Sequence, residues 1–275
     1  MENRERVIVV SGASSGIGNA SATFLAKKGY KVYGTCRAPG AYSRKADEFF
    51  ELLAMDITDS ASVAKAAEKV LSVEGRIDSL VCCAGSGLVG AIEDSSLEEA
   101  RAVMEVNFFG TLRTVKAFLP RMREAEQGRI LLVGALEGLA ATPYQGLFSA
   151  SECALEGLAD ALRMEVASFG IEVCVIALGS FRTAFGQNRL VAAASARGSP
   201  YKAKLDAALG VLSGDEAAGA EPLVAARAIY AALNARRMPS RLSVGPLQRR
   251  LLVLCRPWLP AQLFERLLRK HYRLE

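Results

Sequence analysis

Three glycines near the start of the chain have the spacing of a phosphate-binding turn. Gly12, Gly16 and Gly18 lie in the stretch SGASSGIG, directly after the β-branched run Val7–Ser11 and before a helical pattern that extends to Lys28. In such a unit the first glycine permits a tight turn, the second admits phosphates, and the third lets helix and strand pack closely. The helix N-terminus then faces the phosphates. This position between a strand and a helix favours a dinucleotide site over an ordinary glycine turn.

The end of the second predicted strand indicates which dinucleotide is bound. An acidic residue there would accept hydrogen bonds from the adenosine ribose and repel a 2′-phosphate. The chain has Thr35-Cys36-Arg37 instead, and the planar guanidinium of Arg37 can pair with a phosphate. We therefore expect NADP(H) in preference to NAD(H). Asp56 and Ile57, after the third predicted strand, are expected to border the adenine.

Further motifs follow in order along the chain. They are CCAG at Cys82–Gly85, VNFFG at Val106–Gly110 and LGSFRTAF at Leu178–Phe185. With the glycine loop they resemble the short-chain dehydrogenase/reductase family, and the likeness resumes weakly up to Val244. Within the family, VYGTCR, CCAGSGLVGAIED and VNFFGTLRTVKAFLPRM are most similar to the 17β-hydroxysteroid and retinol dehydrogenases. The resemblance implies hydride transfer between a nicotinamide cofactor and a lipophilic alcohol or ketone.

The resemblance also implies roles for single residues. Asn107 matches the asparagine that helps to hold the active-site water chain, and Thr183 matches the threonine that contacts the nicotinamide amide. Cys83 replaces the asparagine of the family's Asn-Ala-Gly motif, and Leu178 replaces a common proline. The residues expected to bind the cofactor are Gly12, Ser14, Ser15, Gly16, Ile17, Gly18, Arg37, Asp56, Ile57, Ala84, Gly85, Glu152, Gly179 and Thr183.

Three positions at the reaction centre depart from the family pattern. Carbonyl reduction needs a hydride and a proton. The family supplies the proton from a tyrosine, whose ordinary pKa of about 10 is lowered by a lysine one helical turn later. A serine donates a further hydrogen bond to the oxygen. Aligned on ASECALEG, the tyrosine and lysine positions hold Phe148 and Glu152; aligned on Gly138 and Pro143, the serine position holds Ala135.

These substitutions predict a cofactor-binding protein with impaired catalysis, a pseudoenzyme. General acid–base catalysis contributes about 10²–10⁴-fold and an oxyanion donor about 10²–10³-fold, so even one loss is severe. The candidate catalytic positions are Asn107, Ala135, Phe148 and Glu152, the last three as substituted positions. One hypothesis is that the Glu152 carboxylate accepts hydrogen bonds from the nicotinamide ribose. The alternative is that Glu152 points to solvent.

A rival hypothesis keeps the chain an active NADP(H)-dependent oxidoreductase with an unusual acid. Burial can raise the pKa of a carboxyl group towards neutrality. Glu152, or Glu137 on the loop beside the lost serine, would then donate the proton. The alternative for Glu137 is a solvated loop residue.

Alternating strands and helices must position these residues. Strands are predicted at Val7–Ser11, Lys31–Thr35, Leu52–Met55, Ser79–Cys83, Arg129–Val133, Glu172–Ala177 and Arg241–Val244. Helices are predicted up to Lys28 and at Ser60–Val73, Ser96–Arg123, Gln145–Ser168 and Pro222–Asn234. The alternation predicts an α/β fold, a Rossmann-type doubly wound parallel sheet in three α/β/α layers, with ligands at the carboxyl ends of the strands. We expect one dinucleotide-binding domain over residues 1–275, with a loose substrate-loop insertion at about 186–221.

Composition excludes several other classes. Apolar residues make up 51% of the 275 residues, enough for a sizeable core. The six cysteines form no C-x-x-C pair and the only histidine is His271, so no metal site is expected. No apolar run suits a signal peptide or a membrane span, and the expected location is cytoplasmic.

The net charge of +5 belongs entirely to a basic amphipathic tail, residues 247–275. The remainder is neutral, so binding to nucleic acid is not expected. In the tail, Leu263, Phe264, Leu267 and Leu268 form an apolar helical stripe opposite basic residues. Such a helix either makes peripheral contact with an anionic membrane or packs over the substrate cleft or a partner subunit.

The expected partners are a small lipophilic ligand or substrate and further copies of the chain. The helices Ser96–Arg123 and Gln145–Ser168 resemble the family's usual subunit interface. The resemblance therefore implies a homodimer or homotetramer.

Overall fold

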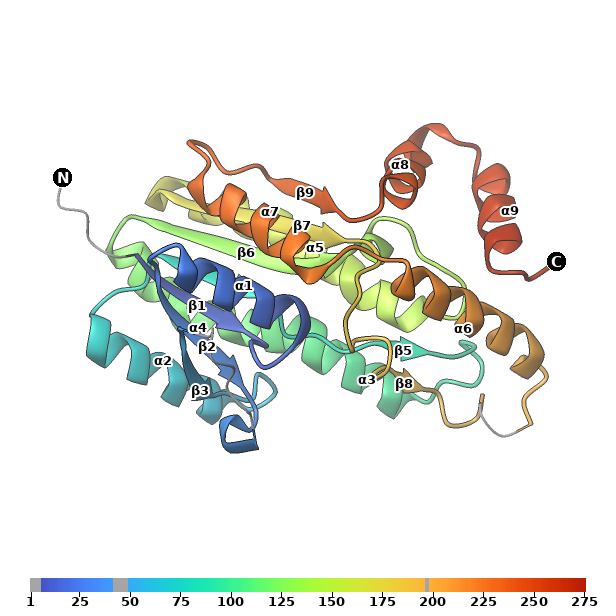
Figure 1. Cartoon of the computed structure of the whole chain (residues 1–275), viewed down its shortest axis with the longest axis horizontal. Coiled ribbons are helices and arrows are strands. Elements are labelled where there is room, and N and C mark those ends of the chain that lie inside the picture. The colour runs from blue at the N-terminus through green and yellow to red at the C-terminus, as the bar shows by residue number, and fades with distance from the viewer. Residues whose placement is uncertain (1–5, 42–48, 196–197) are drawn as a thin grey trace.

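A seven-stranded parallel sheet forms the centre of the molecule (Figure 1). The computed structural model describes residues 6–41, 49–195 and 198–275. The strand order is β3-β2-β1-β4-β6-β7-β9. The strands are β1 (Val7–Ser11), β2 (Lys31–Cys36), β3 (Glu51–Ala54), β4 (Ser79–Cys82), β6 (Gly128–Ala135), β7 (Ile171–Leu178) and β9 (Arg241–Val244). The Rossmann-type sheet is confirmed, and each strand end lies within two residues of its prediction.

Helices cover both faces of this sheet. On one face lie α1 (Gly16–Lys27) and α7 (Pro222–Asn234); on the other lie α2 (Ser60–Glu74), α4 (Thr111–Glu124) and α5 (Gly146–Val166). Within β1, Val7 and Val9 pack in the core under α2, α4 and α5, whereas Ile8 and Val10 pack under α1 and α7. Successive side chains of a strand point to opposite faces, and both faces are buried, so the strand is continuously apolar.

The region predicted to be a loose substrate loop contains a long helix, so that part of the prediction was wrong. Helix α6 spans Lys202–Ala217 and buries Leu205, Ala208 and Leu212. Glycine and serine obscured this pattern, but the apolar residues recur at helical spacing among alanines, which favour helix. A short two-stranded sheet, β5 (Leu88–Val89) with β8 (Leu190–Val191), lies beside α6 (Figure 1).

The segment predicted as one long helix, Ser96–Arg123, is interrupted. Helix α3 (Leu97–Met104) begins at a capping box formed by Ser96 and Glu99 and continues into a π-helical turn, Glu105–Gly110, before α4. A Cβ on Gly110 would lie 2.7 Å from Ile57, so a larger residue does not fit where this turn meets the core. Turns of this kind often mark functional sites.

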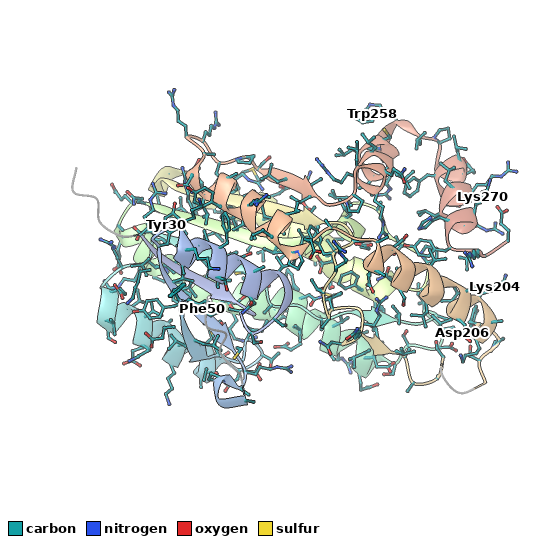
Figure 2. The ribbon with its side chains drawn as sticks, in the orientation of Figure 1. Tyr30, Phe50, Lys204, Asp206, Trp258 and Lys270 are labelled. Carbon is teal, nitrogen blue, oxygen red and sulfur yellow. The ribbon has the colours of Figure 1, made fainter. Side chains whose placement is uncertain are left out.

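The carboxyl ends of β6 and β7 point towards the end of the molecule where α6 and the C-terminal tail gather (Figure 1). The tail consists of α8 (Leu247–Cys255), a 3₁₀ turn and α9 (Ala261–His271). Figure 2 shows Trp258 and Lys270 at the outer side of this tail, pointing away from the sheet. Among the described residues, no helix is long and apolar enough to cross a membrane.

Candidate functional site

The glycine loop between β1 and α1 has the backbone geometry that its spacing predicts. Gly12 and Gly16 have φ angles of 69° and 54°, which glycine adopts without strain. A Cβ on Gly18 would lie 2.3 Å from the carbonyl oxygen of Gly12, so only glycine fits there. The N-cap Ser15 makes no side-chain cap hydrogen bond, and the first turn of α1 has no acidic residue. The first N–H groups of a helix have no partner within the helix, so those of this turn suit the pyrophosphate of a dinucleotide.

Arg37 and Asp56 lie at the neighbouring strand ends. Arg37 is exposed directly after β2; burial raises the pKa of the Cys36 thiol, and the nearby Arg37 and Ser14 oppose that rise. Asp56 accepts hydrogen bonds from the hydroxyl and the N–H of Thr58, and these bonds lower its pKa, with a further contribution from Arg37. Ile57 is buried. The role of Asp56 and Ile57 beside an adenine stays a prediction.

The segment after β7 reaches the same edge of the sheet. A Cβ on Gly16 would lie 3.6 Å from the side chain of Thr183, so the glycine loop and Thr183 face each other. Gly179 donates its N–H to the carbonyl of Val244 at 2.8 Å, which ties this segment to the end of β9. Ile17 packs, partly buried, against the core beneath α1 and α7.

Asn107 connects the loop after β4 to helix α5. Ser11 Oγ accepts the N–H of Ala84 at 3.2 Å and so holds the start of this loop against β1. Asn107 is buried; it accepts the N–H of Ser86 at 2.8 Å and donates to the Ser86 carbonyl at 3.0 Å. A Cβ on Gly85 would lie 3.5 Å from Asn107 Oδ1. The π-helical turn thus aims this amide at the reaction side of the site.

The carboxyl group of Glu152, on α5, points back into the protein. Oε2 accepts the N–H of Ala135 at 2.8 Å, and Oε1 accepts the side-chain amide of Asn107 at 3.4 Å. Burial raises the pKa of Glu152 to about 8; the hydrogen bond from Ala135 opposes this, and Glu137 and Glu156 add to it. Burial therefore favours the protonated form of this carboxyl group. The alternative of a solvent-facing Glu152 is wrong, because only 6% of the residue is exposed.

Phe148, one turn earlier on α5, occupies an apolar contact. It is buried with Leu88 and Val103, and Ala135 packs against this cluster. Its ring centroid lies 5.9 Å from that of Phe185. The junction of β6 and α5 therefore presents a methyl group, a phenyl ring and an inward-turned carboxyl group.

Glu137 is engaged by the C-terminal tail. Arg249 of α8 donates to Glu137 at 3.2 Å, to Ser180 Oγ at 2.5 Å and to the Tyr272 hydroxyl at 3.1 Å. Burial raises the pKa of Glu137, and the nearby Arg249 opposes that rise. The alternative of a solvated loop residue is wrong, because Glu137 is buried and bound by Arg249, which lies 112 residues away in the sequence.

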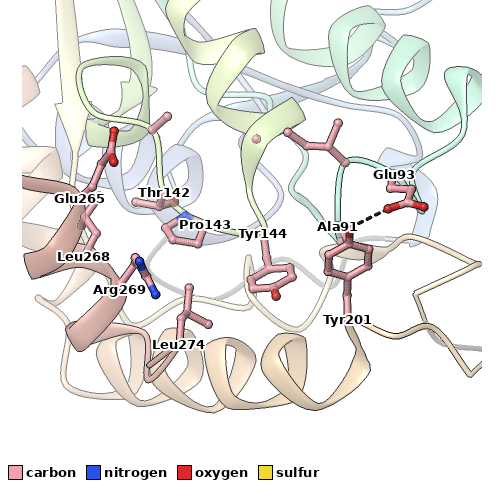
Figure 3. Close-up of a pocket in the computed structure, with 14 residues that line it drawn as sticks. Ala91, Glu93, Thr142, Pro143, Tyr144, Tyr201, Glu265, Leu268, Arg269 and Leu274 are labelled. Atoms are coloured by element: carbon pink, nitrogen blue, oxygen red, sulfur yellow. Dashed lines mark hydrogen bonds between the residues drawn. The ribbon is translucent and has the colours of Figure 1, made fainter. Parts of the chain in front are cut away.

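A pocket of about 720 Å³ opens between the tail and the loops that precede α3 and α5 (Figure 3). Its walls are mainly apolar, with two tyrosines and a few charged side chains. The lining residues are Gly90, Ala91, Ile92, Glu93, Ala141, Thr142, Pro143, Tyr144, Gly146, Tyr201, Glu265, Leu268, Arg269 and Leu274. Gly146 begins α5 two residues before Phe148, so the pocket adjoins the reaction side without including it. Within the described part of the chain, no group of three His, Cys, Asp or Glu side chains could hold a metal ion.

A profile described as short chain dehydrogenase matches residues 6–192. The chain belongs to the short-chain dehydrogenase/reductase family. Members of this family are NAD(P)-dependent oxidoreductases, as the sequence motifs predicted. The match spans the glycine loop, Asn107 and the β6–α5 junction.

Two curated relatives carry more specific names. The chain is 36% identical over 269 residues to 3-ketodihydrosphingosine reductase of Bacteroides thetaiotaomicron. The alignment covers 98% of each protein. It is 40% identical over 191 residues to 17-beta-hydroxysteroid dehydrogenase type 1 of Mus musculus, with 65% of this chain and 55% of that protein covered. The chain therefore spans about half the length of the mouse relative. The predicted similarity to 17β-hydroxysteroid dehydrogenases is found; the one to retinol dehydrogenases stays a prediction.

Solved structures show the same architecture. A short-chain dehydrogenase from Streptomyces avermitilis has a TM-score of 0.81 and 31% identity, with 94% of each chain covered. Another, from Burkholderia cenocepacia, is in complex with NADP; its TM-score is 0.75 at 25% identity, with 97% of this chain and 99% of that chain covered. A family member from Burkholderia phymatum, 23% identical with a TM-score of 0.75, is in complex with NAD; 88% of this chain and 90% of that chain are covered.

The structure brings most of the predicted positions to one edge of the sheet. It also adds residues that sequence reasoning missed. These are the Arg249 and Tyr272 contacts in the tail and the pocket residues Tyr144 and Leu274. Tyr144 has a positive φ of 61°, which is uncommon for a bulky residue, but no sequence pattern indicated it. A pocket formed by four segments that lie far apart in the sequence leaves no local signal.

Proposed function

We propose that the chain binds NADP(H) and that its hydride transfer to a lipophilic alcohol or ketone is strongly impaired. In this proposal the N–H groups of the glycine loop hold the pyrophosphate and Arg37 pairs with the 2′-phosphate. The nicotinamide supplies or accepts hydride when bound. Thr183, which faces Gly16, contacts its amide.

The proposal of impaired turnover rests on the side chains at the junction of β6 and α5. Ala135, Phe148 and Glu152 stand where the family resemblance puts the serine, tyrosine and lysine. A carbonyl oxygen there would meet a methyl group and a phenyl ring, neither of which donates a hydrogen bond. The Glu152 carboxyl group is turned to the Ala135 N–H. A developing alkoxide would thus lack both its proton donor and the cation that prepares it.

The substrate class rests on two observations. The pocket beside this junction is lined mainly by apolar side chains, among them Ile92, Pro143 and Leu268. The names of the two curated relatives describe a ketone of a long-chain base and a hydroxysteroid, which are both lipophilic. NADP(H) is favoured over NAD(H) by the exposed Arg37 and by the absence of an acid at the end of β2.

A second candidate function is an active oxidoreductase that uses Glu152 as its acid. The observation in its favour is the burial of Glu152, which raises its pKa to about 8 and favours the protonated carboxyl group at neutral pH. Donation would require this group to leave Ala135 and face the substrate. Glu137 is a weaker candidate, because Arg249 already binds it.

One experiment separates the two functions. The wild type is compared with Ala135→Ser/Phe148→Tyr/Glu152→Lys for NADPH binding and for NADPH oxidation over long-chain and steroid ketones. We expect both proteins to bind NADPH and the triple variant to gain roughly 10²-fold or more in turnover. Ordinary turnover by the wild type that is lost in Glu152→Gln and retained in Glu137→Gln would overturn the proposal in favour of the second function.

A further inference from the structure

The C-terminal tail is anchored on its inner side. Arg249 joins it to Glu137 and Ser180, and Arg256 donates to the carbonyl of Leu139 at 2.5 Å. Tyr272 is fully buried in a cluster with α6. The tail is therefore packed on the rest of the protein, and the same side chains of α8 and α9 always face outward.

The outer face of α8 is a row of exposed apolar side chains. Leu247, Leu251 and Leu254 are 63%, 49% and 45% exposed, and Trp258 in the following turn is 81% exposed. Their spacing of four, three and four residues places them on one side of a helix. Figure 2 shows Trp258 at the outer limit of the molecule. Such a row differs from the single exposed apolar residues that are common on protein surfaces.

Helix α9 adds positive charge beside this row. Arg266 and Lys270 on α9 and Arg273 just after it are exposed, whereas Arg269 lines the pocket described above. In the described part of the chain, none of them forms an ion pair with an acidic side chain. Leu263 and Leu267 on the same helix are 44% and 41% exposed, whereas Phe264 is buried against the protein. The stripe predicted from sequence is thus divided, with Phe264 facing inward and two leucines facing outward.

We infer that this outer face of the tail, formed by α8, Trp258 and the basic side of α9, docks on an anionic lipid membrane. Exposed leucines and a tryptophan enter the boundary between headgroups and acyl chains, while arginine and lysine pair with anionic headgroups. A second copy of the chain is a poorer occupant. A two-fold contact would place this basic face against itself, and like charges would repel.

Docking would serve the pocket that α9 helps to form. Leu268, Arg269 and Leu274 line it from the tail side (Figure 3). A tail held at the bilayer surface places this apolar pocket beside the phase in which a lipophilic ligand is concentrated. This consequence rests on the proposed function, whereas the docking itself does not.

The single tryptophan of the chain lies on the proposed face, so its fluorescence reports docking directly. The 275-residue chain, without cofactor, is titrated with vesicles of phosphatidylcholine alone and with vesicles that also contain phosphatidylserine. We expect a blue shift of emission with the anionic vesicles, and a much weaker one in high salt or with phosphatidylcholine alone. An equal response to both vesicle types, or none, would overturn the inference.

Two double variants test the residues. Leu251→Asn/Leu254→Asn should weaken vesicle binding at least roughly tenfold, because two side chains no longer enter the apolar phase. Leu223→Asn/Val224→Asn on α7 is the control: these residues are 42% and 44% exposed, and vesicle binding should be unchanged. Equal losses in both variants would contradict the assignment. A second outcome would also contradict it: a blue shift of tryptophan emission that grows with protein concentration in the absence of vesicles and is absent in Leu251→Asn/Leu254→Asn. Such a shift would show that a second copy of the chain covers this face. NADPH titration of the same proteins tests the proposed function separately.

Discussion

The cofactor side and the reaction side of the site are built from different kinds of structure. On the cofactor side, the backbone shapes the site: Gly12 and Gly16 have positive φ angles, and Gly18 packs directly against the Gly12 carbonyl. On the reaction side, side chains decide the chemistry, and they are a phenyl ring at Phe148 and a buried carboxyl group at Glu152.

This difference fits the proposed function, in which the reaction side has changed while the cofactor side persists. The glycine loop is part of the packing between β1 and α1, so its loss disturbs the fold as well as the ligand. A tyrosine can be exchanged for Phe148 with little change in volume, and the core remains filled. Family membership therefore predicts the geometry of the cofactor site more reliably than it predicts the reaction.

The largest expected effect is that of Gly18→Ala. The new Cβ would lie 2.3 Å from the Gly12 carbonyl oxygen, so α1 must shift. We expect the free energy of unfolding to fall by about 3 kcal/mol and NADPH binding to weaken roughly a hundredfold or more. Denaturant unfolding and NADPH titration measure both. Gly210→Ala is the control, since nothing lies within 4 Å of its Cβ. Unchanged NADPH affinity in Gly18→Ala would show that the glycine loop does not bind the cofactor.

Glu152→Gln tests whether the buried carboxyl group on the reaction side makes stability depend on pH. The folded pKa of about 8 lies above the ordinary value of 4.5, so this carboxyl group contributes stability that is complete below 4.5 and is lost as pH rises through 8. The glutamine variant should lack this decline and be more stable than wild type at alkaline pH by roughly 1–3 kcal/mol. Unfolding followed from acidic to alkaline pH tests this. Glu98→Gln, on an exposed ion pair, should keep the wild-type slope. A parallel slope in Glu152→Gln would mean that the carboxyl group is ionised in the fold.

Arg37→Glu should change the choice of cofactor with the smallest energetic effect of the three. A carboxylate after β2 would repel a 2′-phosphate and accept hydrogen bonds from a ribose. We expect NADPH affinity to fall about tenfold, with NADH affinity unchanged or higher. Fluorescence titration with both nucleotides checks this, and Arg227→Glu, exposed on α7, should alter neither. Equal losses for both nucleotides would show that Arg37 does not select the phosphate.

Most of the sheet could be predicted because its signals are local. The runs Val7–Ser11 and Arg241–Val244 match the observed strands, and the others differ by at most two residues. Helix α6 was missed because its glycines and serine resembled a loop. The pairing of subunits through the α4 and α5 region stays a prediction, as does the role of Asn107 in a water chain.

By itself the sequence determined the order of the sheet strands, the glycine turn and the family, because periodicity and backbone demands act over a few neighbouring residues. Only the tertiary structure decided the environments of the two carboxyl groups and the placement of the tail. Glu152 is buried against the Ala135 N–H, and Glu137 binds Arg249. Burial and charge pairing depend on segments that lie far apart in the chain, and only folding brings those segments together.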